Sequence, residues 1–293
     1  MKKYFEKLYH VIRMKEMRIL PGHMSYFLVM SIMPFITLIS FIASFFNLSI
    51  IEVTEFLFRF FPTEVSNLIL PMLTNTNMSL NFILMIVGFY IVSNGMHSII
   101  LVSNTLYKTE DENSILLRIR ALLLTIILIN LFFFTLIVMG FGNMIVKFII
   151  GLEIFEPIST AVYQLFILIK YPIAFILIYF FIKILYTLAP FKKIKSKYMT
   201  KGALFTTIGW ILVTTIYSYY ANNIAHYDLF YGNISNLVVL LIWIYILSYI
   251  FVIGIGINAT EYQLAETVTD KENKNWHINN VYIYYRVYTA DYI

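Results

Sequence analysis

The stretch that decides the fold is Tyr231–Glu261, which reads YGNISNLVVLLIWIYILSYIFVIGIGINATE. Between Leu237 and Ile257 it contains no charged residue. These are about 21 residues, and a helix of that length crosses the hydrocarbon core of a bilayer, which is roughly 30 Å thick. The stretch therefore predicts a membrane-spanning helix.

The composition of the whole chain also indicates an integral membrane protein. Hydrophobic residues make up 60% of the 293 residues, charged residues make up 13%, and the mean hydropathy is +0.79. Soluble domains contain about 25% charged residues, so this chain has too few charges to cover a water-facing surface. It has no cysteine, which excludes disulfides, thiolate metal sites and cysteine nucleophiles.

Six apolar segments are long enough to span, so we expect an all-α integral membrane protein with six transmembrane helices. The expected spans are Met24–Phe46, Asn81–Ser103, Ile119–Phe141, Val162–Leu188, Ala203–Ala221 and Leu237–Ala259. Lys and Arg are retained on the cytoplasmic side of a membrane. With these spans, and with Lys183 near the end of the fourth span counted with the connection that follows it, all of the 21 basic residues except Arg59, Lys147 and Lys170 fall on one side. We therefore expect both termini to be cytoplasmic and the protein to lie in the bacterial cytoplasmic membrane.

These spans divide the chain into a basic cytoplasmic segment 1–23, a six-helix membrane domain 24–260 and a cytoplasmic tail 261–293. The connection Ile51–Phe61 is amphipathic, which predicts a helix in the outer interface or one packed over the mouth of the bundle. The Tyr-rich tail Trp276–Ile293 leaves three structures open, namely a strand pair, an interfacial strip or disorder. The net charge of +5 needs no nucleic acid, because anionic lipid headgroups already attract basic loops.

Polar residues inside the second span are candidates for a binding site. Asn94, His97 and Asn104 have helical spacing with Ser98 between them, so they lie near one helix face. They either line a pathway for a substrate or form hydrogen bonds that hold the helices together. Lys170 also has two interpretations, because it either extends to the outer headgroups or binds an anionic substrate group in a cavity.

The sequence offers no enzyme site. The five histidines are scattered, and none forms metal-ligand spacing with a carboxylate. Walker A, G-x-S-x-G and dinucleotide-binding motifs are absent. We therefore expect a protein that is not an enzyme and that needs no cofactor or metal.

Several short motifs occur in a fixed order between Pro21 and Ala259. Their residues are Pro34 in Met30–Pro34, Asn104 in Ser103–Tyr107, Pro190 in Leu188–Pro190, Gly202 with Ala203, Tyr231 with Gly232, Trp243, Tyr245, Gly254 and Asn258. In order and spacing they resemble the YihY/BrkB family of bacterial inner-membrane proteins, which formerly carried a ribonuclease BN-like label. The resemblance covers nearly all of the membrane part.

One position departs from the family pattern. Where the family usually has Gly-Ala-Glu, this chain has Gly254-Ile255-Gly256. A carboxylate inside a span would be a leading functional candidate because of its cost in lipid, and Gly256 has no side chain to supply it. Either that carboxylate is dispensable or this member has a different mechanism.

The combined sequence evidence favours transport or export of a lipid-like or envelope-related compound, with Asn94, His97, Asn104 and Lys170 as substrate-binding candidates. The alternative is a scaffold without catalytic activity that binds an envelope complex, as a homo-oligomer or with another envelope protein. A membrane ribonuclease is disfavoured, because cleavage of a phosphodiester needs a metal, paired carboxylates or a His/Lys pair. No such set occurs in the aqueous loops.

Overall fold

The computed structural model describes residues 6, 9, 11–45, 81–109, 113–131, 159–223 and 234–289. Every regular element among these residues is helical, and no strand occurs among them. The all-α prediction is therefore confirmed for this part of the chain. The amphipathic stretch Ile51–Phe61 lies outside it.

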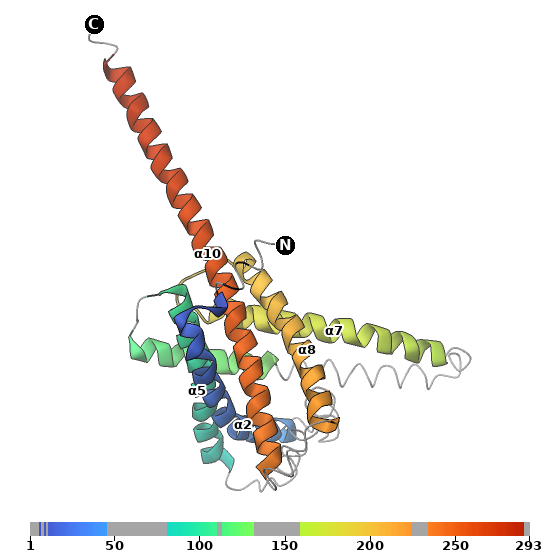
Figure 1. The fold of residues 1–293 in the computed structure, drawn as a ribbon. Helices are drawn as coiled ribbons and strands as arrows, with labels where there is room; N and C mark the ends of the chain where they lie inside the picture. The colour runs from blue at the N-terminus through green and yellow to red at the C-terminus, as the bar shows by residue number, and fades with distance from the viewer. Residues whose placement is uncertain are drawn as a thin grey trace.

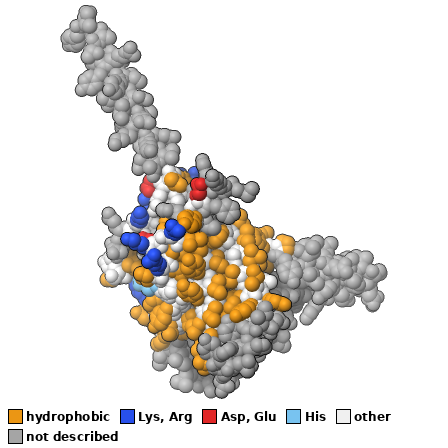
Figure 2. All heavy atoms as spheres, in the orientation of Figure 1, with side chains coloured by type: hydrophobic (Ala, Val, Ile, Leu, Met, Phe, Trp, Pro, Cys, Tyr) orange, Lys and Arg blue, Asp and Glu red, His pale blue; other side chains and the backbone are white. Residues whose placement is uncertain are grey.

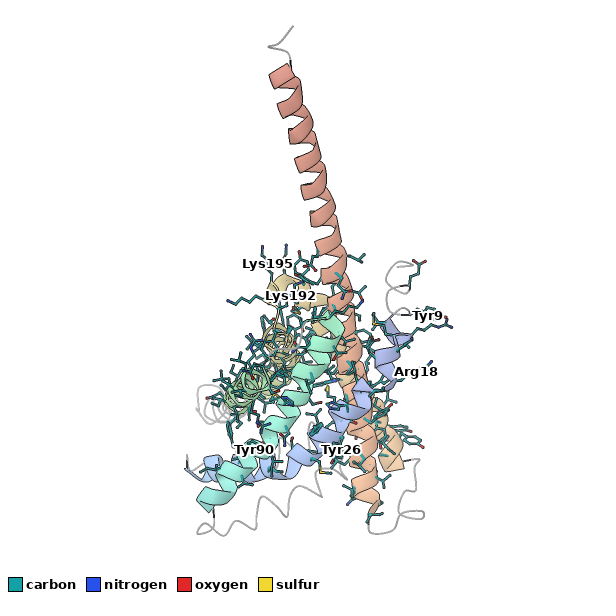
Figure 3. All side chains as sticks on the ribbon, turned by 90° about the vertical axis from the view of Figure 1, so that its left-hand side faces the viewer. Tyr9, Arg18, Tyr26, Tyr90, Lys192 and Lys195 are labelled. Carbon is teal, nitrogen blue, oxygen red and sulfur yellow. The ribbon has the colours of Figure 1, made fainter. Side chains whose placement is uncertain are left out.

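The helices follow the expected apolar segments closely. Their bounds are η1 Lys15–Arg18, α2 Leu20–Phe45, α5 Asn81–Tyr107, a helix Ser114–Leu131, α7 Ser159–Leu188, η4 Ser196–Met199, α8 Thr200–Asn223 and α10 Ser235–Thr289. Pro34 lies inside α2 and Pro172 inside α7. Each proline removes one backbone hydrogen bond from its helix, and α2 bends along its length (Figure 3).

Within the described residues, four helices are long and apolar enough to cross a membrane. They are Ile86–Tyr107, Ser114–Leu131, Ser196–Ala221 and Ser235–Glu266, and Pro172–Leu188 is a shorter apolar helix. This agrees with an all-α membrane protein. The count of six spans and the cytoplasmic placement of both termini stay predictions.

Two directions of packing are visible in the bundle. Helix α2 packs against α5 and α10, and α10 packs against α8, so these four helices stand side by side (Figure 1). Helix α7 and the Ser114–Leu131 helix run across that direction (Figure 1). Hydropathy alone specifies none of these directions, because the packing of neighbouring helices sets the tilt of a span.

Large apolar side chains cover much of the outer surface of the bundle (Figure 2). Tyr26, Ile86, Tyr90, Leu212 and Ile216 are all more than half exposed. A soluble monomer rarely exposes so continuous an apolar surface. The exposed face is therefore the one that a bilayer would cover.

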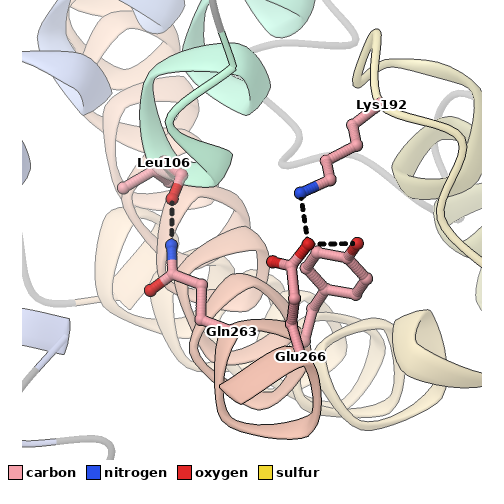
Figure 4. Close-up of polar contacts among 5 residues, drawn as sticks. Leu106, Lys192, Gln263 and Glu266 are labelled. Atoms are coloured by element: carbon pink, nitrogen blue, oxygen red, sulfur yellow. Dashed lines mark hydrogen bonds and ion pairs between the residues drawn. The ribbon is translucent and has the colours of Figure 1, made fainter. Parts of the chain in front are cut away.

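Basic side chains gather at one end of the bundle (Figure 2). There, Nζ of Lys192 lies 2.7 Å from a carboxylate oxygen of Glu266, and Nζ of Lys201 lies 2.6 Å from one of Glu261. Figure 4 shows the first pair, together with the 3.4 Å hydrogen bond from the Gln263 amide to the carbonyl of Leu106. These contacts join α10 to the end of α5, to the chain that follows α7 and to the start of α8.

Helix α10 continues far beyond the apolar run. It is one helix of 55 residues that projects from the bundle (Figure 1). Up to Thr289 the tail is therefore helical, so the strand pair among the three expected alternatives is wrong. The physical reason is helix propagation, since an existing helix gains one backbone hydrogen bond for each residue added.

Candidate polar site on helix α5

Asn94 is the predicted site residue with the strongest polar contact. Its Oδ1 accepts a hydrogen bond of 2.7 Å from Nη1 of Arg118, which lies on the Ser114–Leu131 helix. Nη2 of Arg118 donates to the backbone carbonyl of Tyr90 at 3.0 Å. Cζ of Arg118 lies 3.8 Å from the centre of the Tyr90 ring. Two hydrogen bonds and a cation–π contact thus hold the guanidinium against α5.

This guanidinium lies far along α5 from the basic end. Asn94 and Tyr90 precede the end of α5 at Tyr107 by about 20 and 25 Å, at a rise of 1.5 Å per residue. Figure 3 shows Tyr90 far from Lys192 and Lys195 along the bundle. Since Ile86–Tyr107 is apolar enough to cross a membrane, the charge of Arg118 falls inside an apolar span, where charged groups are costly and commonly functional.

Arg118 has no carboxylate partner within the described part of the chain. The two ion pairs there are Lys192–Glu266 and Lys201–Glu261. Nε of Arg118 is buried and makes no hydrogen bond. A guanidinium has five N–H donors, so donor capacity remains on Arg118 beyond the bonds to Asn94 and Tyr90.

Two histidines lie in the neighbourhood of Asn94. His97 is half-buried and lies one turn beyond Asn94 on α5. Nδ1 of His23 forms a 2.9 Å hydrogen bond with Oγ of Ser98. Arg118, Asn94 and His97 thus form a polar cluster between α5 and the Ser114–Leu131 helix, and His23 joins α2 to α5 at the neighbouring Ser98.

Asn104 lies apart from this cluster and has a different set of contacts. Its Oδ1 accepts a hydrogen bond of 3.0 Å from the backbone N–H of Phe191 in the buried interior. Its carbonyl accepts from the N–H of Thr109 at 3.0 Å and from the Thr109 hydroxyl at 3.2 Å. Asn104 thus connects the end of α5 to the chain after α7. The side chain of Lys170 lies outside the described residues.

Sequence reasoning missed Arg118 as a member of this cluster. It used Arg118 and the neighbouring Arg120 in the positive-inside count and in the family resemblance. Arg120 does lie near the basic end, where its Nη1 donates to the carbonyl of Pro190 at 3.1 Å and its guanidinium lies over the Phe191 ring. The available signal was the position of Arg118 in an otherwise apolar segment, which is costly for a cation.

The small residues of the family motifs bring α8 and α10 together. A Cβ added to Gly202 would overlap the carbonyl of Gly254, and the N–H of Gly202 donates to Oδ1 of Asn258 at 2.7 Å. A Cβ added to Gly254 would overlap the hydroxyls of Thr206 and Tyr186. Only glycine permits this approach, so the motif serves packing at these positions.

Other motif residues also support the bundle. The Trp243 indole N–H donates to Oγ1 of Thr214 at 3.2 Å, joining α10 to α8. The ring of Tyr245 packs beside that of Tyr249, with centroids 6.3 Å apart. Tyr231 and Gly232 lie outside the described residues.

Gly256 stands where the family resemblance implies a carboxylate, and the structure places Val11 against it. A Cβ at Gly256 would lie 2.5 Å from Cγ1 of Val11, which is itself fully buried. A glutamate side chain would need the space that Val11 occupies. The N-terminal segment therefore packs on α10 at the position where this chain lacks the carboxylate.

No group of three or more His, Asp or Glu side chains that could hold a metal ion occurs within the described ranges. The donor set near Arg118 is cationic or neutral, which suits an anion better than a metal ion. The chemistry available to this cluster is therefore binding through hydrogen bonds and charge.

Comparisons with known proteins agree with the membrane character of the chain. Residues 8–277 match the family described as virulence factor BrkB. The chain is 28% identical over 247 residues to the ribonuclease-like protein YfkH of Bacillus subtilis (strain 168), covering 81% of this chain and 87% of that protein. It is 24% identical over 243 residues to a UPF0761 membrane protein of Alteromonas mediterranea, covering 79% and 78%.

A UPF0761 membrane protein of Haemophilus influenzae (strain 86-028NP) is 27% identical over 96 residues, which is 33% of this chain and 36% of that protein. No solved structure matches the chain.

Proposed function

The chain belongs to the BrkB family of membrane proteins, and from this premise we propose that it transports or exports a lipid-like or envelope-related compound across the bacterial cytoplasmic membrane. Membership of this family identifies the chain as a membrane protein but does not identify a substrate. The proposal therefore depends on the polar cluster of α5.

The observation that carries the proposal is the position of Arg118. Its guanidinium is bonded to Asn94 and Tyr90 inside an apolar span and has no described carboxylate partner. Ionisable groups inside membrane spans commonly mark substrate or ion pathways. A protein that only needed to hold its helices together could use neutral polar residues at lower cost.

The gathering of basic residues at one end supports an orientation with that end in the cytoplasm. Lys192 and Lys195 lie at this end, far from Tyr26 and Tyr90 (Figure 3). A compound bound at Arg118 would then lie between the two leaflets. Such a site fits transport better than it fits capture of a ligand from the cytoplasm.

Reconstitution in liposomes tests this function. We expect the wild-type protein to move a fluorescent phospholipid or an envelope-lipid precursor between leaflets, and Arg118→Gln to slow that movement at least about tenfold, which corresponds to the loss of one hydrogen-bonded charge. Lys193→Gln is the matched control, because Lys193 is exposed and also loses one positive charge. Absence of movement by wild-type protein for every lipid and small solute tried would contradict transport.

The second candidate function is a scaffold for an envelope complex, and the projecting part of α10 favours it. A helix that extends to Thr289 provides a long surface beyond the bundle. Stable co-purification with one envelope protein, together with full activity in cells of Asn94→Ala and Arg118→Gln, would support the scaffold. The ribonuclease-like name of a relative predicts cleavage of RNA by purified protein, and we expect none.

A further inference from the structure

Arg118 carries a positive charge, has no carboxylate partner among the residues that the structure describes, and lies beside exposed apolar side chains. Tyr90, which lies under the guanidinium, is 56% exposed, and Ile86 of the same helix is 54% exposed. Ile115 and Ile119 of the Ser114–Leu131 helix are 67% and 48% exposed. Exposed apolar side chains from both helices thus flank the charge.

The donors of the cluster fit an oxyanion. Arg118 uses one N–H of each Nη group on Asn94 and Tyr90, which leaves a second N–H on each and the unpaired Nε. His97 makes no hydrogen bond to any described residue. Arginine forks match the geometry of phosphate and carboxylate oxygens, and a third donor from His97 suits the three oxygens of a phosphate group.

The surroundings distinguish a lipid phosphate from a free anion. An inorganic anion would have to enter an apolar span without any apolar part of its own. A lipid would place its phosphate at Arg118 and its acyl chains along the exposed side chains of α5 and the neighbouring helix, where it buries apolar area. Charge complementarity and the apolar flank therefore point to the same occupant.

We infer that Arg118, His97 and Asn94 form a binding site for the phosphate group of an anionic lipid within the membrane span. This inference rests on the proposed transport function for its biological role, and it names the substrate class. Arg118 supplies the charge, Asn94 positions the guanidinium, and His97 adds a further donor. The lipid occupies the site while its headgroup is away from both membrane surfaces.

Binding in detergent tests the site without requiring transport. Native mass spectrometry of the full chain, titrated with dioleoyl phosphatidic acid, gives the affinity, and dioleoylglycerol is the matched lipid without phosphate. We expect phosphatidic acid to bind at least about tenfold more tightly than dioleoylglycerol. Arg118→Gln should remove most of this difference, and Arg118→Lys should restore part of it.

Control variants separate this site from the basic end of the bundle and from misfolding. Lys193→Gln should bind phosphatidic acid like the wild type, because its charge lies outside the span. His97→Gln, at a position with no described hydrogen bond to lose, should weaken phosphatidic acid binding about threefold without changing the midpoint of thermal unfolding. Equal weakening by Lys193→Gln and Arg118→Gln would place the binding at the basic end and overturn the inference.

Two further outcomes would also overturn it. One is an unchanged affinity of Arg118→Gln for phosphatidic acid. The other is full competition by millimolar inorganic phosphate, which would identify a free-anion site.

If wild-type protein binds phosphatidic acid through Arg118 but moves no lipid in liposomes, the binding site stands and the transport function fails. If it moves lipids without distinguishing phosphatidic acid from dioleoylglycerol, transport stands and the lipid-phosphate site fails.

Discussion

At the scale of single residues, the contact between Gly256 and Val11 fixes the N-terminal segment on α10. Val11 lies against the bare backbone of Gly256 and is fully buried. The glycine therefore has a packing role here. The N-terminal segment contacts α10 through Val11, and any side chain at position 256 would overlap Val11.

We predict that Gly256→Ala lowers the free energy of unfolding by about 1–3 kcal/mol, the usual cost of overpacking a well-packed interior. The added Cβ would lie 2.5 Å from Cγ1 of Val11. Val11→Ala in the same chain should recover much of this loss, because it removes the contacting methyl group. Denaturation in detergent, followed by circular dichroism, gives the double-mutant cycle.

Gly22→Ala is the control for this cycle, because a Cβ at Gly22 has no neighbour within 4 Å. It should leave stability nearly unchanged. Additive effects of Gly256→Ala and Val11→Ala would show that the two positions do not share a contact.

Part of the site could be predicted from residue types alone. Asn94 and His97 were candidates because polar groups in a span need partners. Arg118 was not a candidate, because a basic residue next to an expected span is already explained by the positive-inside rule. The separation of Asn104 from Asn94 could not be predicted either, since helical spacing places residues on a face but does not identify which neighbouring chain reaches each of them.

At the scale of elements, the contact between α10 and the chain after α7 depends on an exposed ion pair. Nζ of Lys192 donates to Glu266, and the Tyr262 hydroxyl donates to the same carboxylate oxygen at 3.3 Å. The hydrogen bond to Glu266 raises the pKa of Lys192, and the same bond lowers the pKa of the Glu266 carboxyl. Both charged forms are therefore favoured in the folded protein.

The contribution of the Lys192–Glu266 pair to the free energy of unfolding changes with pH in a defined direction. The lowered pKa of Glu266 means that its contribution is present at neutral pH and is lost as pH falls through the folded-state pKa. The raised pKa of Lys192 means that its contribution is lost only as pH rises through a value above the ordinary lysine range. We predict that Glu266→Gln costs no more than about 1 kcal/mol at pH 7, as expected for an exposed pair.

Thermal unfolding of wild type and Glu266→Gln at pH 7 and in acid checks this prediction, and the difference between the two proteins should shrink as pH falls. Glu16→Gln is the control, because Glu16 has no ion pair within the described part of the chain. A difference that grows in acid would contradict the assignment.

The elements show where sequence prediction succeeds and where it stops. Long apolar runs such as Leu237–Ile257 were assigned to the correct helices because hydrophobicity and length suffice. The continuation of α10 to Thr289 was missed because the apolar pattern of the sequence ends near Ala259. The helical backbone hydrogen bonds continue beyond that residue. Apolar periodicity arises where one face of a helix packs against neighbouring elements. A helix that packs against nothing shows little of this periodicity in its sequence.

At the scale of the whole molecule, basic side chains gather at one end of the bundle, and α10 begins at the other end. Lys195 is exposed at the basic end, and Ile234 is 57% exposed at the start of α10. The directions of α7 and the Ser114–Leu131 helix could not be predicted from hydropathy. The length of an apolar segment shows that it can span a membrane, but the tilt depends on packing against neighbouring helices.

We predict that the two ends lie on opposite sides of the cytoplasmic membrane. Because the chain has no cysteine, Lys195→Cys and Ile234→Cys each provide a single labelling site. A membrane-impermeant maleimide should label Ile234→Cys in intact spheroplasts, and Lys195→Cys only after permeabilisation. The reverse pattern would invert the orientation, and labelling of both in intact cells would exclude opposite sides.

The unbroken course of α10 has a mechanical consequence. The helix is in contact with α8 at Gly254 and ends at Thr289, which is about 50 Å farther along its axis at 1.5 Å per residue. A rotation of about 5° at that contact would move the far end by about 4 to 5 Å. The length of the projecting helix would thus amplify a small rotation within the bundle into a displacement of several ångströms at Thr289.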